Sequence, residues 1–387
     1  MVSEWDAVLM PVSFFGHICR MSEGLKKEKE EMENLKLENA RVDFGDVNDM
    51  SRYLHDMLES DVHHEIILNS IKTYEEDDEL YLEADTTNGE HVKLPLWPFA
   101  IRSLEKRSGD NATGHELMTN GQILNSMNNY WGLHKDKRKC YATVRGDKIL
   151  GVGSEQYESI SQEEIVEAVT DWMEDRHPNA WIFKDGYYTH QLTSASFEIT
   201  DAISPGYKAA WRKTGLPQSL LDQSHITVRV LTDDTAGCAA KAIVGMNVGG
   251  TNFLLGNPIE IAHRAGHGGI EAFKTELNKV DISIKDELDS LAKLMGVNLL
   301  HPANAGIMAL KKAKIDKISK KACKELIDDM LFGSTESAYI VYLFLHGITG
   351  TPNGSKLSSE RQLRVTTALR TLLKEDWKKL DVPSASL

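Results

Sequence analysis

The residues best suited to bind a polyanion form one basic and aromatic run in the middle of the chain. The stretch HKDKRK at residues 134–139 follows an aromatic pair and leads into a further tyrosine and arginine. Basic side chains neutralise phosphates while aromatic faces stack bases, a combination that suits a single strand. The sequence therefore predicts a nucleic-acid-binding surface made of Tyr130, Trp131, Lys135, Lys137, Arg138, Lys139, Tyr141 and Arg145. The alternative is a solvated loop that balances an acidic N-terminal region.

Arg102, Lys106 and Arg107 would extend this surface if the polar loop predicted at 103–114, which contains the last two, folds back onto it. The total charge of the protein argues against nucleic-acid binding, because the chain carries a formal net charge of -14 at pH 7. Non-specific nucleic-acid binding depends on neutralising phosphates and usually needs a basic surface. A local patch can outweigh the sum, so the charge does not exclude this class.

A second cluster, HRAGHGG, spans residues 263–269. His263 and His267 are four residues apart, so on a helix they would face one side and could ligate a metal. The neighbouring glycines disfavour a helix here, and no HExxH pattern is present. We expect instead that His263 and Arg264 make structural or anion-directed hydrogen bonds, with the N-terminus of the following helix directed at the same loop. Arg264 is therefore added to the predicted nucleic-acid-binding residues, and the two histidines remain weak metal candidates.

Other motifs carry no catalytic signal. NVGGTN at 247–252 lacks the pattern of a phosphate-binding loop and indicates a bulge or turn. DVHHE at 61–65 is predicted to be a solvated surface. No GxSxG motif is present, and four cysteines far apart in the sequence indicate a reducing compartment rather than a disulfide framework. No cofactor is predicted, and an enzyme is disfavoured.

The stretch between Ala142 and Val169 is the most regular part of the chain. A turn at Gly146-Asp147 separates two short apolar runs, which predicts a hairpin. Ser161 and Glu164 form a capping box ahead of an amphipathic helix. We interpret this stretch as scaffold beside the basic run.

Several other elements follow from the pattern. We expect a helix over 50–70, one over 115–131 and hairpins about Asn88-Gly89 and Asp185-Gly186. Strands at 225–232 and 239–248 precede a chain that is mostly helical from residue 268 onward. Because βαβ alternation is missing, the fold class is α+β, with antiparallel hairpins, packed helices and a mostly helical C-terminal half. The predicted division is an N-terminal segment at 1–45 with a charged helix, an α+β core at 46–267 and a helical region at 268–387.

Three stretches resemble a phage- and plasmid-borne family known only as a domain of unknown function, the phage/plasmid-like proteins. The first is ILGVGSEQYESISQEEIVEAV, in which Gly151, Val152 and Tyr157 match. The others are AIVGMNVGGTNFLLGNPIEIAHRAG and STESAYIVYLFLHGITG. The resemblance covers about 60% of the chain, roughly residues 141–373, and departs from the family at GGTN and HRAGH. It implies a mobile-element origin and a bacterial cytoplasm, and it implies no catalytic residues.

The leading hypothesis is a non-catalytic phage early protein that binds or anneals single-stranded DNA, broadly similar to the RecT/Redβ type, and acts as a homo-oligomer. The alternative is a protein-binding or assembly module, such as a host-defence inhibitor, with partner contacts along Leu25, Met32 and Leu35. A metal-dependent enzyme ranks third. No apolar run approaches the roughly 18 residues that a membrane span needs, so no membrane partner is expected.

Overall fold

A computed structural model of the protein describes residues 41–59, 61–110, 114–134, 138–156, 160–233, 235, 239–261 and 269–387. These residues form antiparallel sheets and packed helices, which confirms the α+β class. The predicted charged helix with Leu25, Met32 and Leu35 lies outside the described residues. Within the described part, no helix combines the length and apolarity that crossing a bilayer requires.

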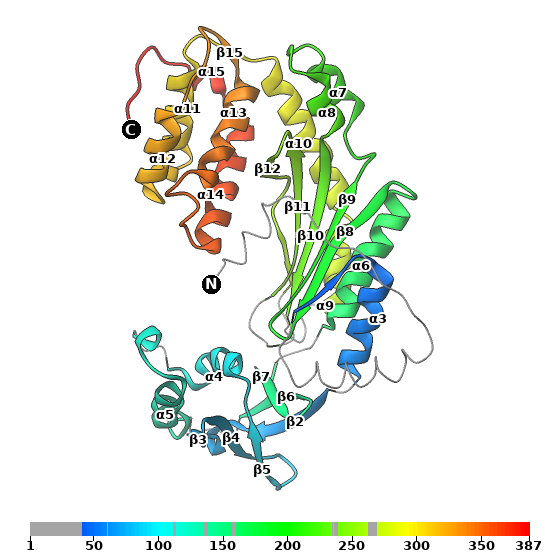
Figure 1. Ribbon diagram of the computed structural model, residues 1–387, viewed down its shortest axis with the longest axis vertical. Coiled ribbons are helices and arrows are strands. Elements are labelled where there is room, and N and C mark those ends of the chain that lie inside the picture. The colour runs from blue at the N-terminus through cyan, green and yellow to red at the C-terminus, as the bar shows by residue number, and fades with distance from the viewer. Residues whose placement is uncertain are drawn as a thin grey trace.

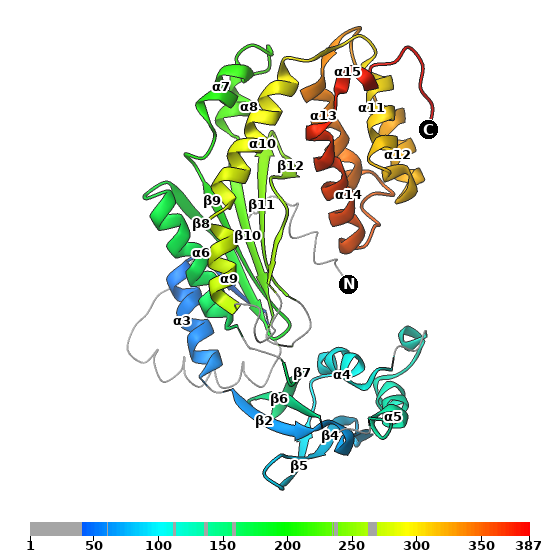
Figure 2. The ribbon, with the colours of Figure 1, turned by 180° about the vertical axis from the view of Figure 1, so that it is seen from behind.

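The centre of the molecule is a large antiparallel sheet with the order β1-β8-β9-β10-β11-β12, to which β13 adds by pairing with β11. Its strands are β1 (Val42–Phe44), β8 (Trp181–Thr189), β9 (Leu192–Ile199), β10 (His225–Thr232), β11 (Ala240–Val248), β12 (Thr251–Leu254) and β13 (Ile259–Ile261). Burial alternates strictly along β10, as expected for a strand with one face in the core. Four helices cover that face, as Figures 1 and 2 show. They are α3 (Val47–Leu58), α6 (Gln162–Arg176), α9 (Gly269–Leu277) and α10 (Val280–Met295).

A β8–β9 hairpin is present here, as predicted, but its turn is not at Asp185-Gly186, because β8 runs through both residues and turns only after Thr189. Gly186 is needed because neighbouring atoms approach its backbone closely, and not because the chain turns there. A Cβ atom at this position would lie 2.6 Å from the Met50 sulfur and 3.2 Å from the Ser194 carbonyl oxygen. The glycine therefore lets α3 and β9 pack tightly against β8.

The helix predicted over 50–70 is also only partly right. It ends at Leu58, and the chain then enters β2 (Val62–Ile67). Asp46 caps its N-terminus by accepting from two backbone amides. The apolar residues Ile66 and Ile67, which continued the helical stripe in sequence, belong to the strand.

Residues 62–154 form a second body, called here the small unit, which lies at one end of the large sheet (Figure 1). It contains two three-stranded sheets, β2-β6-β7 and β3-β4-β5, and its own buried cluster from Ile66 to Val152. Its further elements are β6 (Lys139–Arg145), β7 (Lys148–Ser154), β3 (Lys72–Glu76), β4 (Glu79–Asp85), β5 (His91–Pro95), α4 (Ile101–Ser108) and α5 (Asn120–Trp131). The predicted hairpins at Gly146-Asp147 and Asn88-Gly89 are confirmed as β6–β7 and β4–β5.

From residue 269 onward the chain is mainly helical, as predicted. The main elements after α10 are α11 (Pro302–Lys312), α12 (Lys320–Asp328), α13 (Ala338–His346), α14 (Ser359–Thr371), η6 (Leu372–Lys374) and α15 (Trp377–Leu380). Their apolar side chains join one buried cluster with the large sheet. The predicted domain boundaries at 45/46 and 267/268 stay predictions. The small unit has a core of its own, whereas the described residues before 62 and after 154 share one buried cluster.

One buried histidine in α13 should make stability depend on pH. His346 is 4% exposed, lies 4.8 Å from Tyr342 between ring centroids, and neither ring nitrogen has a hydrogen-bond partner among the described residues. Burial lowers the pKa of His346 to about 3. Below about pH 6.5, His346 binds a proton in the unfolded chain but not in the folded chain. The free energy of unfolding should therefore fall as the pH drops below 6.5, by up to about 1.4 kcal/mol per pH unit.

Urea unfolding between about pH 5 and 6.5 measures this slope. That window lies above the range in which carboxylates such as Glu325, whose pKa is lowered mainly by the Asn353 backbone amide, lose their contribution. His346→Phe retains an aromatic ring and is the control, because it removes the proton acceptor. Equal slopes in the two proteins would show that His346 does not set the pH dependence.

Candidate nucleic-acid interface

The two aromatic residues predicted to stack on bases, Tyr130 and Trp131, differ in their exposure. Tyr130 is half-buried, whereas Trp131 is 1% exposed and packs in the core of the small unit. It continues the apolar face of α5 that includes Leu124 and Met127. Trp131 therefore cannot stack on a base, and its place in the predicted surface was wrong.

Arg145 is likewise buried, with no exposed surface. Its Nε and Nη2 atoms donate to the two carboxylate oxygens of Asp61 at 2.6 Å each, and Nη1 donates to the Tyr188 hydroxyl. A guanidinium held this way is unavailable to a phosphate, so Arg145 also leaves the predicted surface. The prediction that residues 61–65 are merely solvated fails at Asp61, whose side chain is 6% exposed.

The Arg145 side chain joins the small unit to the large sheet, because its third hydrogen bond goes to Tyr188. Arg145 ends β6, whereas Tyr188 lies in β8 and contacts His190 at 2.9 Å from hydroxyl to Nδ1. Trp97 of the small unit packs on the His190 ring at 5.2 Å between centroids. Nearby, a Cβ at Gly151 would meet the Thr235 carbonyl oxygen at 2.3 Å, so β7 lies directly against the chain after β10. These contacts make the region a packed junction, which we call the inter-unit junction.

Lys139 and Tyr141 lie on the outer side of β6 and share one partner, Glu65 of β2. The distances to the Glu65 carboxylate are 3.1 Å from Lys139 Nζ and 3.2 Å from the Tyr141 hydroxyl. The hydrogen bond with Glu65 raises the pKa of Lys139, and hydrogen bonds from Thr87 and then Lys139 lower the pKa of Glu65. Because the Lys139 side chain is 45% exposed, this pair is weak and a phosphate can compete for the lysine.

Helix α4 adds further cations to the small unit, and it packs against β7 and α5. The His134 ring contacts the Ser108 carbonyl oxygen at 2.9 Å and so ties the end of α4 to the segment after α5. Arg107 lies close enough to Cys140 for the two groups to influence each other, and burial lowers the pKa of Arg107. We call the resulting group the basic cluster, consisting of Lys106, Arg107, Arg138 and Lys139.

Helix α5 borders this cluster and contains no Asp, Glu, Lys or Arg. Its N-terminus is fixed by a capping box in which Thr119 and Gln122 bond each other's backbone amides. The exposed side chains of this helix include the amides of Gln122, Asn125 and Asn129. Amide side chains both donate and accept hydrogen bonds, so they can pair with the edges of unstacked bases.

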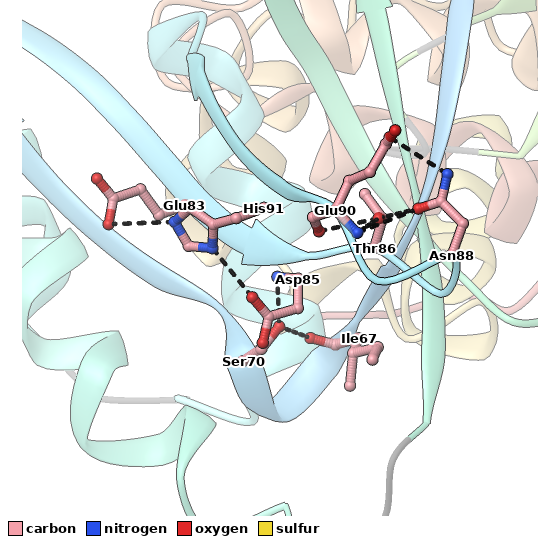
Figure 3. A network of polar contacts seen from close by, with 8 residues as sticks. All are labelled: Ile67, Ser70, Glu83, Asp85, Thr86, Asn88, Glu90 and His91. Carbon is pink, nitrogen blue, oxygen red and sulfur yellow. Dashed lines mark hydrogen bonds and ion pairs between the residues drawn. The ribbon is translucent and has the colours of Figure 1, made fainter.

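Charge is unevenly distributed along the small unit. Residues 98–154 contain nine Lys or Arg against five Asp or Glu, whereas residues 75–90 contain eight acidic residues and no basic one. Figure 3 shows part of the acidic segment, where Asp85 and Glu83 flank His91 and the β4–β5 turn is held by Thr86, Asn88 and Glu90. Thr87 of this turn hydrogen-bonds Glu65, which is also the partner of Lys139 in the basic cluster. A polyanion would therefore be repelled by the hairpin and attracted by the cluster beside it.

Lys135, Lys137, His263, Arg264 and His267 lie outside the described residues. Among the residues that are described, no group of three or more metal-ligating side chains comes together. The metal hypothesis at 263–267 stays a prediction.

Comparisons with models of known protein families, with curated proteins and with solved structures find no match to this chain. The resemblance to the phage/plasmid-like proteins therefore stays a prediction.

Proposed function

We propose that the protein binds single-stranded nucleic acid, without catalysing a reaction, through the basic cluster and the adjacent end of α5. The observation that carries the proposal is the arrangement of three kinds of group on neighbouring elements. Lys106, Arg138 and Lys139 offer charge, Tyr130 offers a partly exposed ring and α5 offers uncharged amides. Phosphate attraction, base stacking and edge contacts are the three interactions that single-strand binding uses.

The proposed surface is smaller than the one expected from sequence, since Trp131 and Arg145 are buried. The total charge of -14 would oppose binding at long range. Screening limits this opposition, because the Debye length is only about 8 Å at physiological ionic strength. We therefore expect weak to moderate affinity that decreases steeply as salt is added. An origin in a phage or plasmid and assembly into a homo-oligomer remain part of the proposal.

Replacing two cations of the cluster should reduce both affinity and salt dependence. For Lys106→Ala with Arg138→Ala, we expect about tenfold weaker binding of an oligothymidylate at low salt. The slope of log K against log salt should fall by about 1, because each neutralised phosphate of a single strand contributes about 0.7. Fluorescence anisotropy titrations at several salt concentrations give both quantities.

The matched control is Arg212→Ala with Lys213→Ala, which removes one exposed arginine and one exposed lysine just after α7 (Pro205–Trp211), outside the small unit. This control should bind like the wild type. A cluster variant with an unchanged slope would exclude the basic cluster as the binding surface.

The alternative, a protein-binding module, is favoured by one feature of the small unit. Leu117 is 87% exposed and Met118 41% exposed, directly before α5. Exposed apolar side chains of this kind are typical of partner surfaces when they cluster. The same titrations separate the two functions, because a protein-binding module would show no affinity for the oligonucleotide.

A further inference from the structure

A cavity of about 540 Å³ lies between α10 and the α14–η6 segment, outside the small unit. Its charged lining residues are three cations and two acids, namely Lys279, Arg370, Lys374, Asp286 and Glu287. Its volume falls in the range of small-molecule sites. A cavity with a cationic excess is notable in a chain whose net charge is -14.

The wall of the cavity contains an arginine with a fixed orientation. Arg370 donates from Nε and Nη2 to Glu287 Oε1, at 2.5 Å each, and from Nη1 to the Asn257 side-chain oxygen. The Glu287 side chain is 8% exposed and that of Arg370 is 17% exposed. A guanidinium has five N–H donors, of which these contacts use three. The remaining donors belong to a rigid fork whose geometry suits a carboxylate or a phosphate.

The buried polar groups behind the arginine are incompletely satisfied. Neither Glu287 Oε2 nor the Tyr342 hydroxyl has a hydrogen-bond partner among the described residues. Burial, and then the charge of Glu287, raises the pKa of Tyr342. A buried ion pair is often no more stabilising than well-packed apolar residues. The pair is therefore better explained by the orientation that it imposes on Arg370 than by stability.

We propose that this cavity binds a small organic anion through a phosphate or carboxylate group. Arg370 contacts the anion and Glu287 positions Arg370. The ammonium groups of Lys374 and of Lys279, which also donates to Glu276, add attraction from the rim. Ile282, which is 64% exposed and also lines the cavity, gives the ligand an apolar surface to pack against. The class is thus an organic anion with one to three negative charges and a non-polar portion, of nucleotide size or smaller.

Isothermal titration calorimetry on the full chain tests the site with three probes: inorganic phosphate, a nucleoside 5′-monophosphate and citrate. We expect at least one probe to bind with a dissociation constant below about 1 mM. Binding of the first two alone identifies a phosphate site, and binding of citrate alone identifies a carboxylate site. Absence of heat from all three at about 10 mM would overturn the proposal.

Lys279→Ala with Lys374→Ala locates the site. Both lysines line the cavity, and we expect at least tenfold weaker binding with an unchanged melting temperature of the free protein. Lys208→Ala with Lys213→Ala is the matched control and should bind as the wild type does. Arg370→Lys keeps a charge opposite Glu287 but loses the fork, so it should also weaken binding at least tenfold. Unaltered binding by the double lysine variant would place the anion elsewhere and overturn the proposal.

Discussion

Arg145→Met should lower the free energy of unfolding by about 3–5 kcal/mol. The substitution leaves the Asp61 carboxylate, whose side chain is 6% exposed, without its bidentate partner at the inter-unit junction. Removing one member of a buried ion pair is strongly destabilising because the other charge stays buried. The Tyr188 hydroxyl also loses a donor, which weakens the contact between β6 and β8. Urea unfolding followed by far-UV circular dichroism measures the change.

The double variant Asp61→Asn with Arg145→Met separates the loss of the pair from the loss of packing. We expect it to be more stable than Arg145→Met alone, because no charge stays buried. Arg102→Met, at an exposed arginine of α4, is the matched control and should change stability by less than about 0.5 kcal/mol. If Arg145→Met were as mild as this control, Arg145 would not hold the junction together.

The neighbours Tyr130 and Trp131 should respond to alanine in opposite ways. Trp131→Ala should destabilise the protein by about 3–5 kcal/mol, since it removes a large side chain that is 1% exposed in the core of the small unit. Tyr130→Ala should change stability by less than about 1 kcal/mol, because its ring is only half-buried. It should weaken oligonucleotide binding by about tenfold or more, as expected when a stacking ring is removed.

Thermal unfolding and anisotropy titrations on the same two preparations make this comparison, and Tyr130→Phe is its control. The phenylalanine keeps a stacking surface and should retain most of the affinity. Two outcomes would contradict the assignment. One is a Trp131→Ala protein with wild-type stability, and the other is a Tyr130→Ala protein with wild-type affinity.

Local signals in the sequence predicted several elements correctly. Ser161 and Glu164 mark the start of α6, where the capping box is observed, and Gly146 adopts a φ of 66° in the β6–β7 turn. Both features depend on residues within a few positions of each other, which is why the sequence alone is sufficient to predict them. The same reasoning failed at Gly186, because a glycine needed for a close approach has the same sequence signature as a glycine in a turn.

The candidate site was predicted less well, for a physical reason. Arg145 stands next to a Gly-Asp turn and close to a basic run, so the sequence favours an exposed position. Its burial depends on Asp61 and Tyr188, which are 84 and 43 residues away in the chain. Glu287 and Arg370 were missed in the same way, being 83 residues apart on two amphipathic helices. A single sequence does not indicate which distant charges will meet in a core.

Cross-linking of a 4-thiothymidine oligonucleotide, followed by peptide mapping, tests most directly whether the small unit binds single strands. After irradiation and digestion, the cross-linked peptides should come from α5 and the start of β6, around Tyr130 and Lys139. An excess of unmodified oligonucleotide or added salt should suppress these cross-links. Two results would contradict the proposed function. One is cross-linking confined to the large sheet or the C-terminal helices, and the other is cross-linking no stronger than that of the Lys106→Ala/Arg138→Ala variant.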